Sequence, residues 1–363
     1  MTVRALWLLA LLPFACTRPN TGLEIGGDNG GGVGKGGMGD SGVIGGDTLP
    51  DAGGTVAPGN TDLAVGGSAA DATIVGPSND YGQDGPTPST DFSPTVTRPN
   101  RLGFTIRVFV PSSAGTHGVV VLSSGLLQPA SAYLSYAKRL ASWNLIAILR
   151  DDPGPGTQSA DVATDISYLV RTWLPSQNGD PTSPLAGKVD LARVALAGHA
   201  RGAQAALLAA LGDSKGHVRG VFGLDPVDTA QGNTRARDTL PQLGVPTAFL
   251  GELTDAGGGI GAQACAPSAD NFLVLYAAAP SPSLALTAVG ADQTQFEDPA
   301  SCTYCGFCMK GSADGKTVLA YSVRYLTAFF ARELLGDSHV GATLDGAGAQ
   351  ADVSAGLIQL VAK

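Results

Sequence analysis

The pentapeptide Gly198-His199-Ala200-Arg201-Gly202 has the glycine spacing of a nucleophile elbow, G-x-S-x-G, with alanine at the serine position. An elbow is a tight turn between a strand and a helix, and it needs small flanking residues because the two elements pack closely there. The helix that follows directs free backbone N–H groups toward the turn. The segment "RVALAG" predicts a buried strand before the turn and "AQAALLAAL" predicts an apolar helix after it, so the context fits an elbow.

Three further predicted strands end in residues that could contribute to a site. "VVVLSSG" is followed by Leu126, "VFGLDPVD" contains Asp225 and Asp228, and "SLALTAVGADQ" runs into a loop with Gln293. In a sheet of parallel strands, ligands and catalytic groups gather at the carboxyl ends of the strands. We therefore expect these residues to lie with the elbow at one edge of a sheet.

The elements that would position these residues alternate along the chain. Buried or alternating apolar runs predict strands over 103–110, 117–124, 145–149, 193–198, 218–224, 246–251 and 283–288, and helical spacing predicts helices over 129–143, 159–174 and 317–335. Ser159 is the expected capping residue of the second of these helices. Strands that alternate with helices predict one α/β domain over 97–363, with a mostly parallel central sheet and helices on both faces.

The N-terminus reads as an export signal. "MTVRALWLLALLPFAC" has one basic residue, Arg4, then about ten apolar residues, which is too short to span a bilayer. Ala15 before Cys16 is typical of a bacterial lipobox, although Pro13 and Phe14 depart from that pattern. We expect a signal peptide over 1–16, acylation of Cys16, and a protein anchored on the periplasmic or cell-surface face of a bacterial membrane. The alternative is an ordinary signal peptide and a secreted protein.

Residues 17–96 are rich in Gly, Asp, Pro, Ser and Thr and contain few large apolar side chains. Such a segment cannot bury enough surface to offset its ordering entropy, so we expect a disordered tether between the anchor and the domain. The net charge of −9 excludes the electrostatic footprint of a protein that binds nucleic acid or an anionic membrane face. Contact with the membrane is therefore expected through the lipid anchor only, and no cofactor is expected.

Four of the five cysteines lie in the last third of the chain: Cys265, Cys302, Cys305 and Cys308. In an exported protein an even set of cysteines predicts two disulfides, in one of three connectivities. The alternative treats "CTYCGFC" as a metal or iron–sulfur ligand run, but the Cys-Pro that follows such a run in ferredoxins is missing. We expect disulfides and no metal.

The segments "SSGLLQPASAY", "RDDPG", "AGHARG", "LDPVDT" and "GADQTQF" resemble the chlorophyllase-like branch of the α/β-hydrolases, which neighbours the dienelactone hydrolases and the cutinase-like polyester hydrolases. The resemblance covers roughly residues 98–340. Position by position, it implies that the nucleophile falls on Ala200, the acid on Asp225 and the base on Gln293. It therefore implies a carboxylic-ester hydrolase fold in which two of the three catalytic positions have changed.

The resemblance also implies the remaining parts of the site. The backbone N–H groups of Leu126 and Arg201 would form the oxyanion hole, and Ser124-Gly125 would stand where a His-Gly pair is common. Asp255, in "GELTDA" after a later strand, is the alternative acid.

Both changed positions have chemical consequences. Alanine has no heteroatom, so no acyl-enzyme can form at Ala200. Glutamine does not titrate near neutrality, so Gln293 cannot act as a general base. In a serine protease, loss of the nucleophile alone lowers turnover about 10⁶-fold. The four histidines offer no obvious substitute, and each is expected to be structural or solvated: His117, His199, His217 and His339.

These observations favour an exported protein that is inactive or severely impaired as an ester hydrolase and that retains a cleft for a small ester-like or apolar ligand. A single engineered substitution would explain Ala200 but not Gln293 as well. The two changes together therefore favour natural loss of the catalytic residues. Two alternatives remain: an active hydrolase in which Asp225 or Asp255 activates water, and a purely structural surface lipoprotein.

Overall fold

The runs of aliphatic residues form the strands of one ten-stranded sheet in the computed structural model, which describes residues 79–99, 103–154, 156–230, 234–259, 262–298 and 307–363. The strand order is β1-β3-β5-β4-β6-β7-β8-β9-β10, and β2 pairs with β3. The strands are β1 (Ser89–Phe92), β2 (Thr95–Val96), β3 (Phe104–Pro111), β4 (His117–Ser123), β5 (Ile146–Arg150), β6 (Val189–His199), β7 (Val218–Leu224), β8 (Thr247–Gly251), β9 (Ser283–Ala288) and β10 (Ile358–Ala362).

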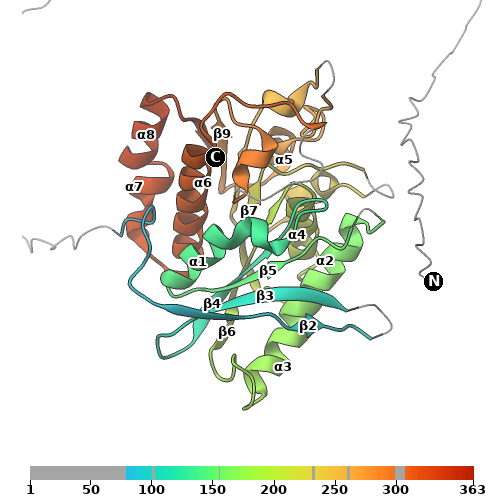
Figure 1. Cartoon of the computed structure of the whole chain (residues 1–363), viewed down its shortest axis with the longest axis vertical. Helices are drawn as coiled ribbons and strands as arrows, with labels where there is room; N and C mark the ends of the chain where they lie inside the picture. The colour runs from blue at the N-terminus through green and yellow to red at the C-terminus, as the bar shows by residue number, and fades with distance from the viewer. Residues whose placement is uncertain (1–78, 100–102, 155, 231–233, 260–261, 299–306) are drawn as a thin grey trace, which may run out of the picture. The chain divides into compact units, whose positions relative to one another are not determined.

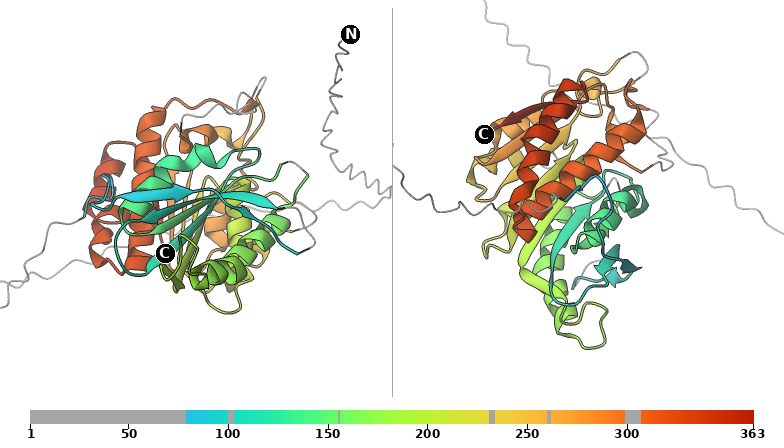
Figure 2. Two further views of the ribbon diagram at one scale, coloured as in Figure 1. Left: turned by 60° about the horizontal axis from the view of Figure 1, so that its bottom comes forward. Right: turned by 90° about the vertical axis from the view of Figure 1, so that its left-hand side faces the viewer.

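The six central strands, from β5 through β4, β6, β7 and β8 to β9, are parallel to one another. Antiparallel strands complete the two edges: β3 and β1 on one side and β10 on the other. This arrangement confirms the mostly parallel sheet predicted from the sequence. The strands fan out across the sheet (Figure 2), as the right-handed twist of strands requires.

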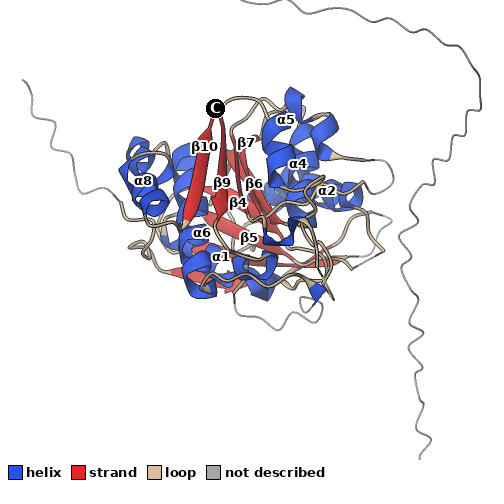
Figure 3. Ribbon diagram, turned by 90° about the horizontal axis from the view of Figure 1, so that it is seen from above, coloured by secondary structure: helices blue, strands red, loops and turns tan. Residues whose placement is uncertain are grey.

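Helices cover both faces of the sheet (Figures 1 and 3). Helices α1, α6, α7 and α8 contribute to one apolar core, and α2, α3, α4 and α5 contribute to the other. The helices are α1 (Leu134–Ser142), α2 (Ser159–Tyr168), α3 (Leu174–Gly179), α4 (Arg201–Leu211), α5 (Phe272–Ala278), α6 (Gly315–Phe330), α7 (Gly341–Leu344) and α8 (Ala347–Ser354). Within the described ranges, no helix is both long enough and apolar enough to cross a bilayer.

Strand β4 illustrates why the central strands read as continuous apolar runs. Val120 and Leu122 point into the core on the α1 and α6 side, whereas Val119 and Val121 point into the core on the α2 and α4 side. Successive side chains of a strand face opposite sides of the sheet, so the middle of a strand covered on both sides is apolar at every position, and the polar residues His117 and Ser123 stand at its two ends. All seven residues of β4 are buried.

The sheet begins earlier than the domain boundary predicted at residue 97. Strand β1 pairs with β3, and Val96 of β2 is buried. Tyr81, further toward the N-terminus, is also buried and packs at a tilt against Trp143, with ring centroids 4.7 Å apart. No strand was predicted here because β1 has the sequence "STDF", in which three of four residues are exposed. The predicted signal peptide, Cys16 and the greater part of the predicted tether lie outside the described residues.

Ser159 does not cap α2 as predicted. The N-cap residue is Gln158, whose side chain makes no capping hydrogen bond, and Ser159 is the first helical residue. Its hydroxyl instead donates to Oε1 of Gln204 in α4 at 2.6 Å. A hydroxyl on the first turn can serve either the helix end or a neighbouring helix, and here the packing of α2 against α4 decides.

Candidate functional site at the carboxyl edge of the sheet

The turn between β6 and α4 has the close packing that an elbow requires. A Cβ atom on Gly198 would lie 2.3 Å from the carbonyl of Gly202, and one on Gly202 would lie 2.2 Å from the carbonyl oxygen of Ser123 in β4. Both positions therefore accept only glycine. Between them, Ala200 has φ +48° and ψ −118°, a left-handed conformation that a residue with a Cβ rarely adopts. The strained backbone of an elbow is thus present around a side chain that has no reactive atom.

The two predicted oxyanion donors belong to the ends of neighbouring elements. Arg201 is the first residue of α4, and Leu126 follows β4 by three residues. Within the described part of the chain, neither backbone N–H donates a hydrogen bond to the protein. The first N–H groups of a helix have no partner inside the helix, so this edge of the fold can still bind an oxygen atom.

Asp152, in the loop after β5, links the residue next to Leu126 to the side chain of Arg201. Its Oδ2 accepts from the backbone N–H groups of Leu127 at 2.8 Å and Gly154 at 2.9 Å. Its Oδ1 pairs with the guanidinium of Arg201, and both side chains are almost fully buried. The sequence marks Asp152 only as part of the segment "RDDPG"; its contact with an arginine 49 residues away depends on the crossover from β5 to β6.

Gln293 begins the short 3₁₀ turn that follows β9. The preceding Asp292 accepts from the backbone N–H of Thr294, and the side chain of Gln295 accepts from the backbone N–H of Asp292, so the two form a capping box. In this turn the backbone N–H of Gln293 donates to Asp255, and its carbonyl oxygen lies near Nε2 of His199. Gln293 and Ala200 line the same small cavity.

Of the two candidate acids, Asp255 is the one in contact with position 293. Its Oδ2 accepts from the backbone N–H of Gln293 at 3.2 Å, and its Oδ1 accepts from the backbone N–H of Met309 at 2.6 Å. Asp225 is fully buried after β7, and its Oδ1 accepts from the N–H of Glu252 at 3.1 Å. Among the described residues, Oδ2 of Asp225 has no hydrogen-bond partner.

Burial raises the pKa of Asp225 well above its ordinary value, and the neighbouring Glu252 adds to the effect. Glu252 is itself fully buried, and burial raises its pKa to about 7. Ionising both buried carboxyl groups would place two negative charges side by side away from water, which costs free energy. Asp225 and Glu252 therefore share at least one proton near neutral pH. Asp228, the other acid of "LDPVDT", accepts from Ala236 and Gln204 and anchors the following loop.

The cavity at the elbow is small, about 70 Å³ in volume. That is about twice the share of liquid volume that one water molecule takes up. Its lining includes the predicted nucleophile and base positions, Ala200 and Gln293, and one of the two predicted oxyanion positions, Leu126; Arg201 is not part of it. The other lining residues are Gly125, Gln128, His199, Thr294, Glu297 and Cys308. Asp225 and Asp255 are not part of this lining.

His199 lies beneath the cavity and is held at both ring nitrogens. Nε2 lies 3.1 Å from the carbonyl oxygen of Gln293, and Nδ1 lies 2.8 Å from the hydroxyl of Tyr133. A carbonyl only accepts, so the proton sits on Nε2 and Nδ1 accepts from the tyrosine. Burial lowers the pKa of His199 to about 4, so the ring is neutral at pH 7. Tyr133 in turn accepts from the N–H of Gly125 at 3.1 Å.

The other three histidines lie away from the cavity lining. His117 is buried at the start of β4, with its ring nitrogens near the carbonyl oxygens of Asn144 and Ser113. His217 contacts Asp213 beside α4, and His339 is exposed near Asp337. None of the three adds a base to the site.

A disulfide joins Cys265 and Cys308, whose Cα atoms are 5.5 Å apart. This bond confirms the expectation that these two cysteines are disulfide-bonded, and it supplies the pairing that the sequence left open. Both sulfur atoms lie close to a carboxylate oxygen of Asp255, but a sulfur in a disulfide carries no thiolate and is a poor metal ligand. Cys302 and Cys305 lie outside the described residues.

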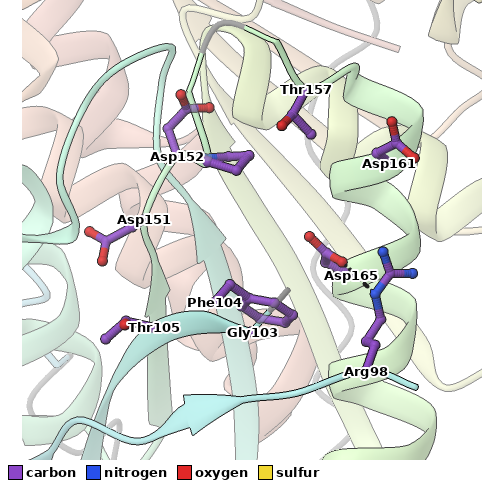
Figure 4. Close-up of a pocket in the computed structure, with 10 residues that line it drawn as sticks. Arg98, Gly103, Phe104, Thr105, Asp151, Asp152, Thr157, Asp161 and Asp165 are labelled. Atoms are coloured by element: carbon purple, nitrogen blue, oxygen red, sulfur yellow. Dashed lines mark ion pairs between the residues drawn. The ribbon is translucent and has the colours of Figure 1, made fainter. Parts of the chain in front are cut away.

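A larger pocket of about 480 Å³ lies beside the β5 loop (Figure 4). Its walls carry four carboxyl groups: Asp151, Asp152, Asp161 and Asp165. Arg98 pairs with Asp165 at 2.7 Å. The pocket contains none of the predicted nucleophile, acid or base positions. Two of its lining residues, Asp152 and Thr157, contact the guanidinium of Arg201 at the elbow.

The parallel central strands, the elbow after β6 and the residues at the ends of β7, β8 and β9 define an α/β-hydrolase. A family model described as Chlorophyllase matches residues 89–317, and the chain belongs to the chlorophyllase family. No curated protein matches the chain.

Proposed function

We propose that this member of the chlorophyllase family has lost acyl-enzyme catalysis and retains the elbow cavity as a binding site for a small ester-like or apolar ligand. The observation that carries the proposal is the elbow itself. Its strained backbone and paired glycines surround Ala200, while Gln293 lines the same cavity. Neither side chain can attack a carbonyl or carry a proton between groups near neutral pH.

We also propose that the protein is exported and anchored through Cys16. The apolar N-terminal run before Cys16 supports export, and the Cys265–Cys308 disulfide supports an oxidising compartment. Metabolic labelling with a fatty-acid analogue tests the anchor: the native chain incorporates label and Cys16→Ser does not. Equal labelling of both chains would remove this part of the proposal.

The two alternative functions have less support. An active hydrolase that uses Asp225 or Asp255 to activate water needs one of these carboxyl groups at the cavity, and neither lines it. Both oxygens of Asp255 already accept backbone N–H groups. A purely structural role would leave unexplained why the backbone N–H groups of Leu126 and Arg201 donate no hydrogen bond within the described part of the chain.

A reversion series in the full chain tests the loss of acyl-enzyme chemistry. We expect no detectable hydrolysis of a short-chain p-nitrophenyl ester and no fluorophosphonate labelling of the native chain. Ala200→Ser restores labelling weakly, and Ala200→Ser with Gln293→His restores both labelling and hydrolysis. Pairing Ala200→Ser with Gln359→His is the matched control, since residue 359 is exposed on the edge strand β10. Ready hydrolysis by the native chain, with labelling of a serine, would refute the proposal.

A further inference from the structure

Strand β10 forms one edge of the ten-stranded sheet (Figure 3), and no described strand pairs with its outer side. It runs antiparallel to β9, where Lys363 and Ser283 exchange both of their backbone hydrogen bonds. Such pairs recur at every second residue of an antiparallel ladder, so Val361 and Gln359 also bond to β9. The N–H and C=O groups of the alternate residues therefore point away from the sheet: Ile358, Leu360 and Ala362. None of these groups bonds elsewhere among the described residues.

The opposite edge of the sheet, strand β1, has features that hinder pairing with a further strand. It is four residues long, Pro88 precedes it and Pro94 follows it closely. Its Asp91 forms an ion pair with Arg107 at 2.7 Å. Short length, proline and charge are devices by which natural sheets keep an edge unpaired. Strand β10 contains neither proline nor a charged residue, since its sequence is "IQLVA".

The segment that contains α8 and β10 exposes little charge, although the chain has a net charge of −9. From Gly346 to Lys363 the only ionisable side chains are Asp352 and Lys363. Asp352 is buried and pairs with Arg324. Nζ of Lys363 donates to the carbonyl oxygen of Tyr276 at 2.5 Å. Two copies of this surface can therefore meet without the repulsion that two negatively charged chains would otherwise experience.

Helix α8 packs beside β10 and presents small side chains to solvent. Its Ala349 is buried in the core on the α6 side of the sheet. The exposed positions of the helix carry nothing larger than glutamine: Ala347, Gly348, Gln350, Ala351 and Ser354. Large side chains at these positions would hold two paired edges apart, and α8 has none.

We propose that β10 pairs with β10 of a second copy of this chain, antiparallel and about a two-fold axis at Leu360. In this register Leu360 lies opposite Leu360 of the second copy, and Ile358 lies opposite its Ala362. Each outward N–H then donates to the outward C=O opposite it, so the free backbone groups of the edge are satisfied. The two sheets become one continuous sheet. No residue of β10 or α8 lines the elbow cavity, so pairing leaves the lining of both cavities unchanged.

The arrangement of β10 favours a second copy over a foreign strand. The outward residues are spaced evenly about Leu360, so a two-fold axis there uses all of them, as an interface between identical surfaces requires. Val361, which is 56% exposed, comes to lie opposite the exposed Gln359 of the second copy. A foreign strand would have to supply its own matching residues, whereas the second copy presents an uncharged edge of the same length.

Sedimentation velocity of the full chain over a range of concentrations tests this pairing, and we expect a monomer–dimer equilibrium. Positions 359 and 361 lie opposite each other across the axis. Gln359→Lys with Val361→Lys therefore places like charges opposite each other twice and raises the dissociation constant at least about tenfold. Gln359→Glu with Val361→Lys places opposite charges there instead and keeps the dissociation constant within a few-fold of native.

Ser89→Lys with Thr90→Lys is the matched control, because it adds the same two charges at exposed positions of the other edge strand, β1. It leaves the dissociation constant unchanged. Hydrogen exchange locates the contact: in the native chain, exchange of residues 357–363 slows as the concentration rises. In the variant with two lysines in β10, exchange of this segment stays fast over the same range.

Four results would overturn the inference. The first is a monomer at every concentration, and the second is equal dissociation constants for the two β10 variants. The third is an equal weakening by the β1 control, which would make net charge the cause. The fourth is slow exchange of residues 357–363 that does not depend on concentration, which would assign the outer side of β10 to another segment of the same chain.

Discussion

Replacing Gly202 with alanine sets helix propensity against the packing of the elbow. Gly202 is the second residue of α4, where alanine would be favoured over glycine by about 0.5–1 kcal/mol on intrinsic grounds. The new Cβ, however, would lie 2.2 Å from the carbonyl oxygen of Ser123 and 2.4 Å from that of Ser124. Both contacts are with backbone, so no side-chain rotation relieves them.

The size of the effect follows from how far the elements must separate. A carbon–oxygen contact needs a separation about 1 Å larger than these distances. Strand β4 and helix α4 must therefore move apart within a packed core. Overpacking of this kind costs about 1–3 kcal/mol, and two backbone contacts place Gly202→Ala at the upper end. After the gain in helix propensity, we expect a net loss of about 2 kcal/mol in the free energy of unfolding.

Urea unfolding of the full chain, followed by circular dichroism, measures this loss as a lower midpoint. Gly212→Ala at the C-terminal end of α4 is the matched control. Its Cβ would lie 3.5 Å from the carbonyl oxygen of Leu208, an ordinary contact, and its backbone is in the right-handed helical region. We expect Gly212→Ala to be neutral or slightly stabilising. Equal midpoints for both variants would refute the steric account of the elbow.

Two further predictions concern buried charge. Arg201→Met leaves the buried Asp152 without its charged partner, so the free energy of unfolding falls by about 3–5 kcal/mol. Arg107→Met, in the exposed pair with Asp91, is the control and lowers it by less than about 1 kcal/mol. Similar decreases in the urea midpoint for both variants would contradict this. Folding raises the pKa of Glu297 to about 8, so the folded chain holds a proton that the unfolded chain releases above about pH 4.5. Stability therefore falls, relative to Glu297→Gln, as the pH rises from 5 to 8, by an amount on the order of 4 kcal/mol. A constant difference between the two chains across this range would show that Glu297 titrates normally.

Sequence patterns predicted the central strands because each is covered on both sides. Val119 to Leu122 in β4 had to be apolar at every position, and this kind of run is visible without a structure. The edge strand β1 gave no such signal, since three of its four residues are exposed. Hydrophobic patterning reports burial, so it locates the middle of a sheet better than its edges.

The supporting contacts of the site were much less visible. Asp152 and Glu297 carry no motif of their own, and each lies beside a residue far away in sequence, Arg201 and His199 respectively. Burial, which raises the pKa of Glu297, is a property of the packed site. No pattern of neighbouring residues could have indicated it.

The amino-acid sequence alone determined that residue 200 has no heteroatom and residue 293 no titratable group, because these are properties of the side chains themselves. Only the tertiary structure decided which acid reaches position 293. Asp255 contacts the backbone of Gln293, and Asp225 lies buried beside Glu252. The register of β7, β8 and β9 and the turns that follow them set these contacts, and a shift of one residue would exchange which side chains meet.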